Sequence, residues 1–486
     1  MVSTTPVQPV NTDEDTFLYQ QVVERISRQI HQGGLAPGER LPSLRQLSKQ
    51  LQLSVPTVRQ AYLELERQGL LEARPKSGYF VQALQRRPLV SSGGRENHPC
   101  QVRCRQLLDR VMQGIHRPDT LPLSIANPSM ALPATKALHR TMKRVMARTQ
   151  ERSLTYAPHA GEPGLRWQVA HRYQQQFEQV DPDQVIITNG AQEALAIALQ
   201  CSASAGAIIA VEAPCYHGHL ELIESLGMLA LEIETDPLTG VSLDCLRQAL
   251  DQHNIAACLF SSALNNPLGS LSNDEDRRQL VAMLEARDIP LIEDDVYGEL
   301  VFSGRRPPLA RQYSERGLVL TCSSFAKTLA PGFRVGWLLA GRYHDRASKL
   351  KRALSCSSGL LQQLTLAEFI ANGDYDRHLR RLLPVLQSNA QRMRAMIESH
   401  FPAHTRVSQP HGGSVLWLEM DPTFDSDSFF DQALAAGVSI MPGALFSADQ
   451  RFNHYLRISY GHPWSEQLEE GIARLGQLAG EITASH

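Results

Sequence analysis

The residues best suited to chemistry surround a single lysine, Lys327. The segment Ser323–Trp337 places it among small and apolar side chains, with the Ser324 hydroxyl three residues before it and Arg334 seven after. A desolvated lysine has a lowered pKa and can form a Schiff base with an aldehyde, while a hydroxyl and a guanidinium can hold that aldehyde's phosphate. The alternative is a surface lysine, but apolar residues and glycine flank this one. The pattern therefore favours a covalent site for a phosphorylated aldehyde.

Two other segments follow apolar runs and carry complementary groups. Ile292–Tyr297 contains Asp294 and ends an apolar strand, so its carboxylates emerge where α/β sheets bind ligands. A carboxylate there can keep a pyridine nitrogen protonated. Thr188–Leu195 reads as a strand, a glycine turn and a helix start, whose free N–H groups suit a phosphate. Neither segment is specific on its own. Paired acids at a strand end often cap a helix or face solvent, and a strand followed by a glycine turn and a helix is common.

A regular alternation of apolar runs and helical stretches predicts the scaffold for these groups. Such a pattern is typical of buried parallel strands with crossover helices. We expect an α/β domain over 118–486, built on buried parallel strands joined by crossover helices. The apolar runs are Val185–Ile187, Ala207–Val211, Ala257–Phe260 and Pro290–Ile292.

A different pattern over 15–83 predicts a small separate domain. A helix is expected over Leu18–Ile30, a short one after the N-cap Ser43, and a longer one after the N-cap Ser54. Two short strands then enclose Arg74-Pro75-Lys76-Ser77. This arrangement is a winged helix-turn-helix. The expected inner face of the third helix is Val58, Ala61, Tyr62 and Leu65.

The small domain is expected to bind DNA. Its third helix presents Thr57 and Arg59 as a recognition helix presents side chains to base edges, while Arg45 and Lys76 are placed to hold phosphates. Residues 15–117 hold 16 Lys and Arg against 8 Asp and Glu, whereas 118–486 hold 32 against 40. A basic head on an acidic body favours a polyanionic partner for the head. The predicted DNA contacts are Arg45, Ser54, Thr57, Arg59, Lys76 and Ser77.

The rest of the composition bounds the class of protein. Residues 84–117 lose clear periodicity and predict a polar linker, with a short helix around Cys104–Met112. The eight cysteines are scattered and suggest neither a zinc site nor disulfides, so we expect no metal. Because the sequence has no long apolar run and no signal sequence at its start, we expect a cytoplasmic protein without a membrane partner.

The N-terminal segments resemble the GntR family of bacterial regulators. The resemblance rests on Pro37–Arg45, Leu51–Val58, Ala61–Leu70 and Ser77–Val81. The family often has a basic residue after the turn serine, where this chain has Val55.

Residues 118–486 resemble the fold-type I, class I aminotransferases, in which pyridoxal 5′-phosphate (PLP) is the cofactor. The resemblance implies a mostly parallel central sheet with helices on both faces and a smaller C-terminal α+β part. The resemblance implies that Lys327 bonds PLP, that Asp294 faces its pyridine nitrogen, and that Arg457 binds a substrate's α-carboxylate. It assigns the phenolic oxygen to Asn266 and Tyr297, the ring face to Tyr216, and the phosphate to Ala191, Gln192, Ser324 and Arg334, with Tyr156 reaching it from a partner subunit.

The two resemblances together are those of the MocR subfamily. The resemblance to this subfamily implies a head-to-tail homodimer that binds operator DNA. It also implies that PLP, or its adduct with an amino compound, is the signal that alters DNA binding. Three hypotheses remain: a PLP-responsive regulator, a working aminotransferase with a DNA-binding head, and a repressor whose large domain only dimerises. The third is disfavoured, because a dimerising scaffold needs none of the cofactor residues.

Overall fold

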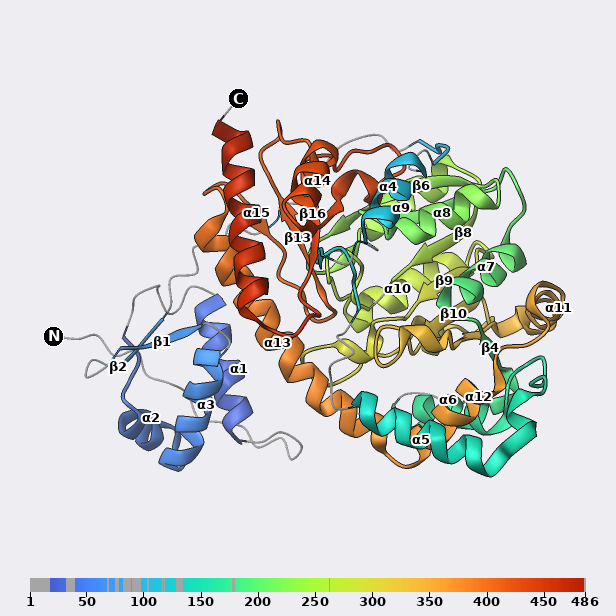
Figure 1. Ribbon diagram of the computed structural model, residues 1–486, viewed down its shortest axis with the longest axis horizontal. Coiled ribbons are helices and arrows are strands. Elements are labelled where there is room, and N and C mark those ends of the chain that lie inside the picture. The colour runs from blue at the N-terminus through green and yellow to red at the C-terminus, as the bar shows by residue number, and fades with distance from the viewer. Residues whose placement is uncertain are drawn as a thin grey trace. The chain divides into compact units, whose positions relative to one another are not determined.

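The structure is a computed structural model of the 486-residue chain (Figure 1). It describes residues 18–31, 40–67, 70–74, 78–81, 89, 98–102, 105–115, 117, 119–127, 134–176, 180–261 and 263–484. The chain divides into two compact units, residues 1–86 and 87–486, and each is described by itself.

The first unit has three helices and a two-stranded sheet, as the sequence predicts. The helices are α1 (Leu18–His31), α2 (Leu44–Leu51) and α3 (Val55–Arg67), and the antiparallel strands are β1 (Leu71–Arg74) and β2 (Gly78–Val81). Ser43 caps α2 by accepting a hydrogen bond from the Gln46 N–H, while the Gln46 side chain accepts one in return.

The core of the first unit lies between its helices and the sheet. Val58, Ala61, Tyr62 and Leu65 of α3 are fully buried, which confirms the predicted inner face. The Tyr62 hydroxyl donates to the Pro42 carbonyl at 2.8 Å and so ties α3 to the segment that precedes α2. Helix α3 is therefore fixed by packing on one face, while Arg59, Gln60 and Leu63 on its other face are exposed.

The second unit is built on an eight-stranded sheet. The strand order is β4-β11-β10-β9-β8-β5-β6-β7, in which β10, β9, β8, β5 and β6 pair in parallel and the remaining pairs are antiparallel. The predicted mostly parallel sheet is confirmed. The strands are β4 (Val185–Thr188), β5 (Ile208–Ala213), β6 (Leu229–Asp236), β7 (Gly240–Val241), β8 (Ile255–Phe260), β9 (Leu291–Asp294), β10 (Val319–Ser324) and β11 (Gly336–Leu339).

Helices cover this sheet, and a smaller sheet lies beside it (Figure 1). The smaller antiparallel sheet has the order β12-β13-β16-β15, and a short parallel pair joins β3 to β14. The helices are α4 (Arg105–Ile115), α5 (Ala134–Thr149), α6 (Pro163–Gln176), α7 (Ala191–Ser202), α8 (His217–Ser225), α9 (Leu243–Gln252), α10 (Asp274–Glu285), α11 (His344–Ser355), α12 (Leu360–Ala371), α13 (Asp374–His400), α14 (Ser426–Ala435) and α15 (Glu466–Ala484). The additional strands are β3 (Leu121–Pro122), β12 (Arg406–Val407), β13 (Val415–Glu419), β14 (Val438–Ser439), β15 (Met441–Pro442) and β16 (Tyr455–Ser459).

Strand register brings distant segments of the large unit to one edge of its sheet. Cys322 of β10 pairs with Asp294 of β9, and Ser324 pairs with Gly336 of β11, which in turn pairs with Thr188 of β4. The turns that follow β4, β9 and β10 therefore open at neighbouring positions, and these turns carry the residues singled out above.

The segment expected to be a linker differs in part from the prediction. Its helix is present as α4, but the Cys100 N–H donates to the Ala230 carbonyl at 2.9 Å, and Val102 and Val111 are buried in the large unit's core. Apolar burial thus draws 98–102 and 105–115 onto the large unit, and the boundary between the units falls between residues 86 and 87. Within the described parts of the chain, no helix has both the length and the apolar character needed to span a membrane.

Candidate functional site

Lys327 lies in the turn that follows β10, at the edge where the strand ends meet. Its Nζ donates to Asn127 Oδ1 at 2.8 Å. Burial and the nearby Arg457 guanidinium lower the pKa of Lys327 to about 8. A neutral amine is thus far more accessible near neutral pH than for an exposed lysine, as a nucleophilic lysine requires.

Asp294, the last residue of β9, is held by two donors. His219 Nε2 lies 2.8 Å from Asp294 Oδ2, and the Val296 N–H donates to Oδ1 at 3.1 Å. The other His219 nitrogen, Nδ1, is 3.7 Å from Cys215 Sγ. This chain of contacts fixes the orientation of the carboxylate while leaving it able to accept a further proton donor.

Aromatic side chains lie beside this carboxylate. Tyr216 precedes α8, and its ring meets the His219 ring edge-on at 5.4 Å. Burial raises the pKa of Tyr216 and of Tyr297, and the charges of Asp294 and Arg457 act on both phenols. Tyr216 and Tyr297 are therefore both close enough to Asp294 and Arg457 for the same two charges to affect them.

Arg457 projects from β16 into the same region and is 2% exposed. Its guanidinium donates to the Ser124 carbonyl oxygen and, at 3.4 Å, to Asn266 Oδ1, and it lies 5.4 Å from the centre of the Phe446 ring. Burial lowers the pKa of Arg457. The described contacts give this cation no carboxylate partner, so its charge is available to an anionic ligand.

The guanidinium of Arg334 lies beside the N-terminal end of α7. Gly190 has φ +80°, and a β-carbon there would lie 2.5 Å from Arg334 Nη2, so only glycine fits without displacing the guanidinium. Arg334 Nη2 also donates to the Asn189 carbonyl at 3.1 Å. Ala191 and Gln192 form the first turn of α7, whose unpaired N–H groups favour an anion. The Gln192 side chain itself turns away and donates to the Gly218 carbonyl.

The site contains groups that still lack partners. Tyr297 Oη and Arg457 Nε are buried and make no hydrogen bond of normal geometry to described residues, although Ser414 is near enough to affect the pKa of Tyr297. Burying such groups is costly unless a ligand satisfies them. A lysine of lowered pKa, a strand-end carboxylate, a buried phenol and a cationic helix start together fit PLP.

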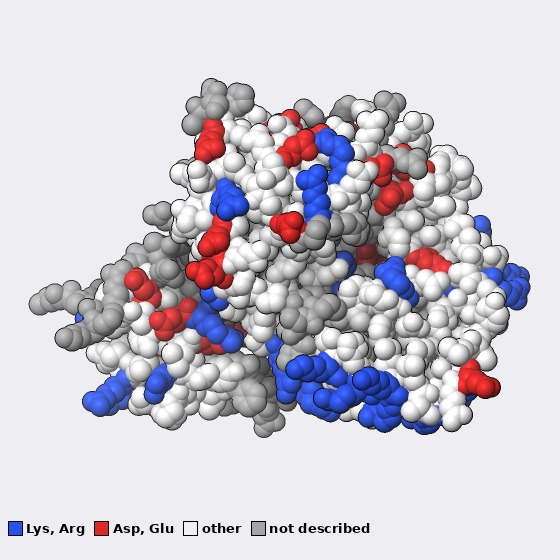
Figure 2. Space-filling model, in the orientation of Figure 1, with Lys and Arg blue, Asp and Glu red and all other residues white. Residues whose placement is uncertain are grey.

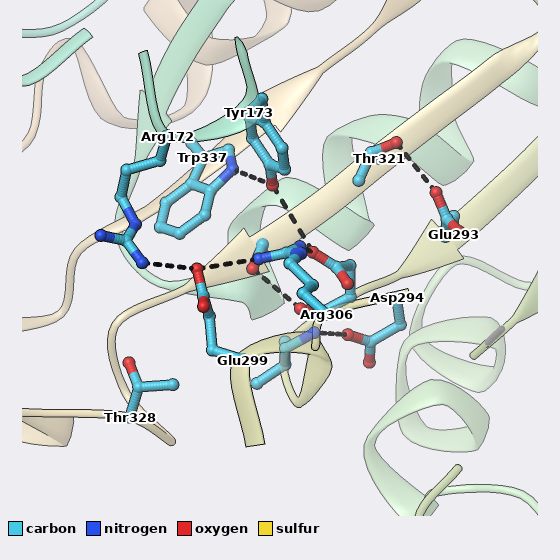
Figure 3. Close-up of polar contacts among 12 residues, drawn as sticks. Arg172, Tyr173, Glu293, Asp294, Glu299, Arg306, Thr321, Thr328 and Trp337 are labelled. Carbon is cyan, nitrogen blue, oxygen red and sulfur yellow. Dashed lines mark hydrogen bonds and ion pairs between the residues drawn. The ribbon is translucent and has the colours of Figure 1, made fainter. Parts of the chain in front are cut away.

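A buried ionic network anchors the strand end that carries this site (Figure 3). Arg306 contacts the carboxylate of Asp295 and donates to Glu299 at 3.0 Å, and Glu299 also accepts from Arg172 at 3.0 Å. Tyr173 lies 3.5 Å from the Asp295 carboxylate. Asp295 therefore has a structural role, while its neighbour Asp294 is left to the ligand pocket.

Tyr156 does not join the pocket of its own chain. Its side chain is 85% exposed, as is that of Leu154. The expectation that Tyr156 serves a partner subunit remains a prediction.

On the small unit, four of the six predicted DNA contacts are described, and two of these four also cap a helix. Arg45 and Arg59 are exposed on α2 and α3. Ser54 Oγ accepts a hydrogen bond from the Thr57 N–H at 3.2 Å and lies 2.7 Å from Thr57 Oγ1, so this pair caps α3. Lys76 and Ser77 lie outside the described residues.

Sequence reasoning missed His219, Asn127 and Ser124. The spacing of Tyr216 and His219, three residues apart at a helix start, could have suggested that both face one pocket. No pattern links Ser124 and Asn127 to residues some two hundred or more positions away, because those contacts depend on the pairing of β3 with β14.

Comparison with known families matches both units. The family of aminotransferases of class I and II matches residues 119–475, and the gntR family of bacterial regulatory proteins matches residues 18–81.

Individual proteins match over almost the whole chain. The uncharacterized HTH-type transcriptional regulators YjiR and YdcR of Escherichia coli (strain K12) are 35% and 34% identical to this chain. The alignments cover 94% and 95% of this chain and 98% and 99% of theirs.

Among solved structures, the α-aminoadipate aminotransferase LysN of Thermus thermophilus, complexed with N-(5′-phosphopyridoxyl)-L-leucine, has a TM-score of 0.72 and 26% identity. The match covers 78% of this chain and 96% of that one.

Proposed function

Because the chain belongs to the aminotransferase class I and II family and carries a GntR-family DNA-binding domain, we propose that its aminotransferase-fold unit senses PLP or an amino compound that reacts with PLP. The chain is a helix-turn-helix transcription regulator of the MocR type, and PLP is its cofactor. The sensing step and its effector are the proposal.

One observation supports sensing above all others. The residues proposed to bond and orient PLP occur together in a chain whose other unit leaves Arg45 and Arg59 exposed on its helix-turn-helix. A scaffold that only joined two DNA-binding heads would not need Lys327 at a pKa of about 8 or a carboxylate fixed by His219.

The residues have separable tasks in this proposal. When bound, PLP supplies an electrophilic carbonyl that reacts with amines. Lys327 provides the neutral amine that holds it, Asp294 holds a proton at the pyridine nitrogen, and Arg334 with the start of α7 binds its phosphate. Arg457 binds the carboxylate of an amino compound through Nε and one terminal nitrogen, for which its planar fork is suited.

Arg457 also gives the sensor a means of response. Its guanidinium donates to the Ser124 carbonyl, on the segment that leads from β3 to Asn127. An incoming carboxylate competes for the same guanidinium. We therefore expect effector binding to loosen the segment 121–127, which also contacts Lys327 through Asn127.

The regulator is proposed to act as a head-to-tail homodimer on operator DNA. Leu154 and Tyr156 are each 85% exposed on the large unit, and an exposed apolar side chain next to an aromatic one favours a subunit contact. In the dimer, Arg45 and Lys76 bind phosphates and Thr57 and Arg59 face base edges of each half-site.

A working aminotransferase is the second candidate, and the completeness of the pocket favours it. The same Lys327, Asp294 and Arg457 would serve turnover if a substrate were held in a productive pose. Release of a keto acid from an amino acid, measured with PLP and an acceptor keto acid, distinguishes this candidate from a sensor that binds without turnover.

The test of the proposal is a promoter-protection experiment. The full-length protein, without and with PLP, is footprinted on its own upstream region and then titrated with a panel of amino acids and simple amines. The proposal predicts that PLP or one amine class changes the protected region or the affinity. Protection that is indifferent to PLP and to every amine in the panel would contradict it.

A further inference from the structure

The large unit carries a strongly basic helix on its surface. Helix α5 contains five Lys and Arg residues and no Asp or Glu, within a region, 118–486, that is net acidic with 32 basic and 40 acidic residues. In Figure 2, Lys and Arg side chains gather in a band along the lower edge of the view, over the part of the molecule where Figure 1 places α5. The positive charge is thus concentrated rather than dispersed.

The helix presents three of these charges directly outward. Leu138, Thr141 and Val145 form its buried face. At 100° per residue, Lys136, Arg140 and Lys143 lie on the opposite side, and all three are exposed. We call these three residues the α5 patch.

The α5 patch has no acidic partner among the described residues. The nearby carboxylate of Glu368 on α12 is occupied by Arg144 at 2.5 Å and by Arg148 at 2.7 Å, on the flank of α5. Neighbouring like charges one helical turn apart repel each other and weaken a helix. Binding of a polyanion to the α5 patch would relieve this repulsion and is therefore favourable.

From this charge pattern we propose that the α5 patch binds the sugar-phosphate backbone of duplex DNA, so that the aminotransferase-fold unit is a second DNA-contacting surface. The three charges span about 10 Å of helix, and duplex DNA offers a negative charge about every 1.7 Å of its axis. The inference rests on DNA as the partner of the head. The bound DNA would then be longer than the DNA-binding heads alone require, because it would also contact the large units.

The test uses the full-length protein and a random-sequence duplex of about 60 base pairs, because phosphate contacts carry no sequence information. Binding is measured by fluorescence anisotropy across a series of salt concentrations. The triple variant Lys136→Gln, Arg140→Gln, Lys143→Gln should bind more weakly than wild type, with a salt slope smaller by about 2 to 3, since each phosphate contact contributes about 0.9. The single variant Lys143→Gln should lower the slope by about 1.

A matched control removes the same charge from another helix of the large unit. Arg346, Lys349 and Arg352 are exposed on α11, and changing all three to Gln should leave the salt slope near the wild-type value. An equal loss in both triple variants would show a general charge effect and overturn the proposal. An unchanged salt slope in the α5 variant would also overturn the proposal. A change in the oligomeric state of that variant, measured by sedimentation, would overturn it as well, because it would place α5 in a subunit interface.

Two further arms separate this inference from other partners and from the proposed function. If the wild type binds anionic phospholipid vesicles through the α5 patch but the duplex slope is unaffected, the partner is a membrane and the proposal fails. If Arg45→Ala loses duplex binding and the α5 variant does not, the proposal that α5 is a second DNA-contacting surface is overturned. DNA binding by the head would still be supported.

Discussion

The pH dependence of cofactor attachment follows from the surroundings of Lys327. Only the neutral amine can attack an aldehyde, because the ammonium has no lone pair. Burial and the Arg457 guanidinium lower the pKa of Lys327 from 10.5 to about 8. At pH 7 this shift raises the neutral fraction from about 0.03% to about 9%, a gain of roughly 300-fold.

Attachment of PLP to the apoprotein should therefore accelerate as pH rises through about 8 and level off above it. Arg457→Gln removes a positive charge that disfavours the ammonium, so its rate profile should move to higher pH. Arg352→Gln, on the surface of α11, is the control and should keep the wild-type profile. Stopped-flow absorbance of PLP mixed with apoprotein between pH 6 and 10 measures all three. A wild-type midpoint near 10.5, or coincident profiles for wild type and Arg457→Gln, would refute the reasoning.

Three other substitutions test separate parts of the molecule. Arg457→Ala should still bind PLP, with its attachment profile moved to higher pH as in Arg457→Gln, but lose its spectral response to amino acids; an unchanged titration with amino acids would mean that no carboxylate is held there. Arg45→Ala should weaken operator and scrambled DNA alike, whereas Arg59→Ala should cost about 1–3 kcal/mol on the operator only; equal losses on both DNAs would make Arg59 a phosphate contact. Tyr62→Phe removes the hydrogen bond to Pro42 and should lower the free energy of unfolding of the head by about 1 kcal/mol in urea titrations, and no change would show that this bond is not stabilising.

The elements of both units were predictable where local pattern decides structure. Ser43 and Gln46 form the capping box that their spacing indicates, and the buried face of α3 follows its apolar period. Lys327 and Asp294 were identifiable because Asp294 ends β9 and Lys327 follows β10, and the ends of parallel strands meet at one edge of a sheet. Arg334 was identifiable by its place seven residues after Lys327.

Contacts between distant segments were not predictable in the same way. Ser124 and Asn127 reach Arg457 and Lys327 only because β3 pairs with β14 of the C-terminal part. The sequence places 98–102 and 105–115 in a linker, whereas Val102 and Val111 are buried in the core of the large unit, a contact that local periodicity does not reveal.

The central claim, that the PLP pocket controls DNA binding, is tested most directly by the operator affinity of wild type and Lys327→Ala with and without PLP. The account predicts that PLP changes the affinity of the wild type, and that this change disappears in Lys327→Ala while its PLP-free affinity stays at the wild-type value. An equal response to PLP in both proteins, or no response in either, would contradict it.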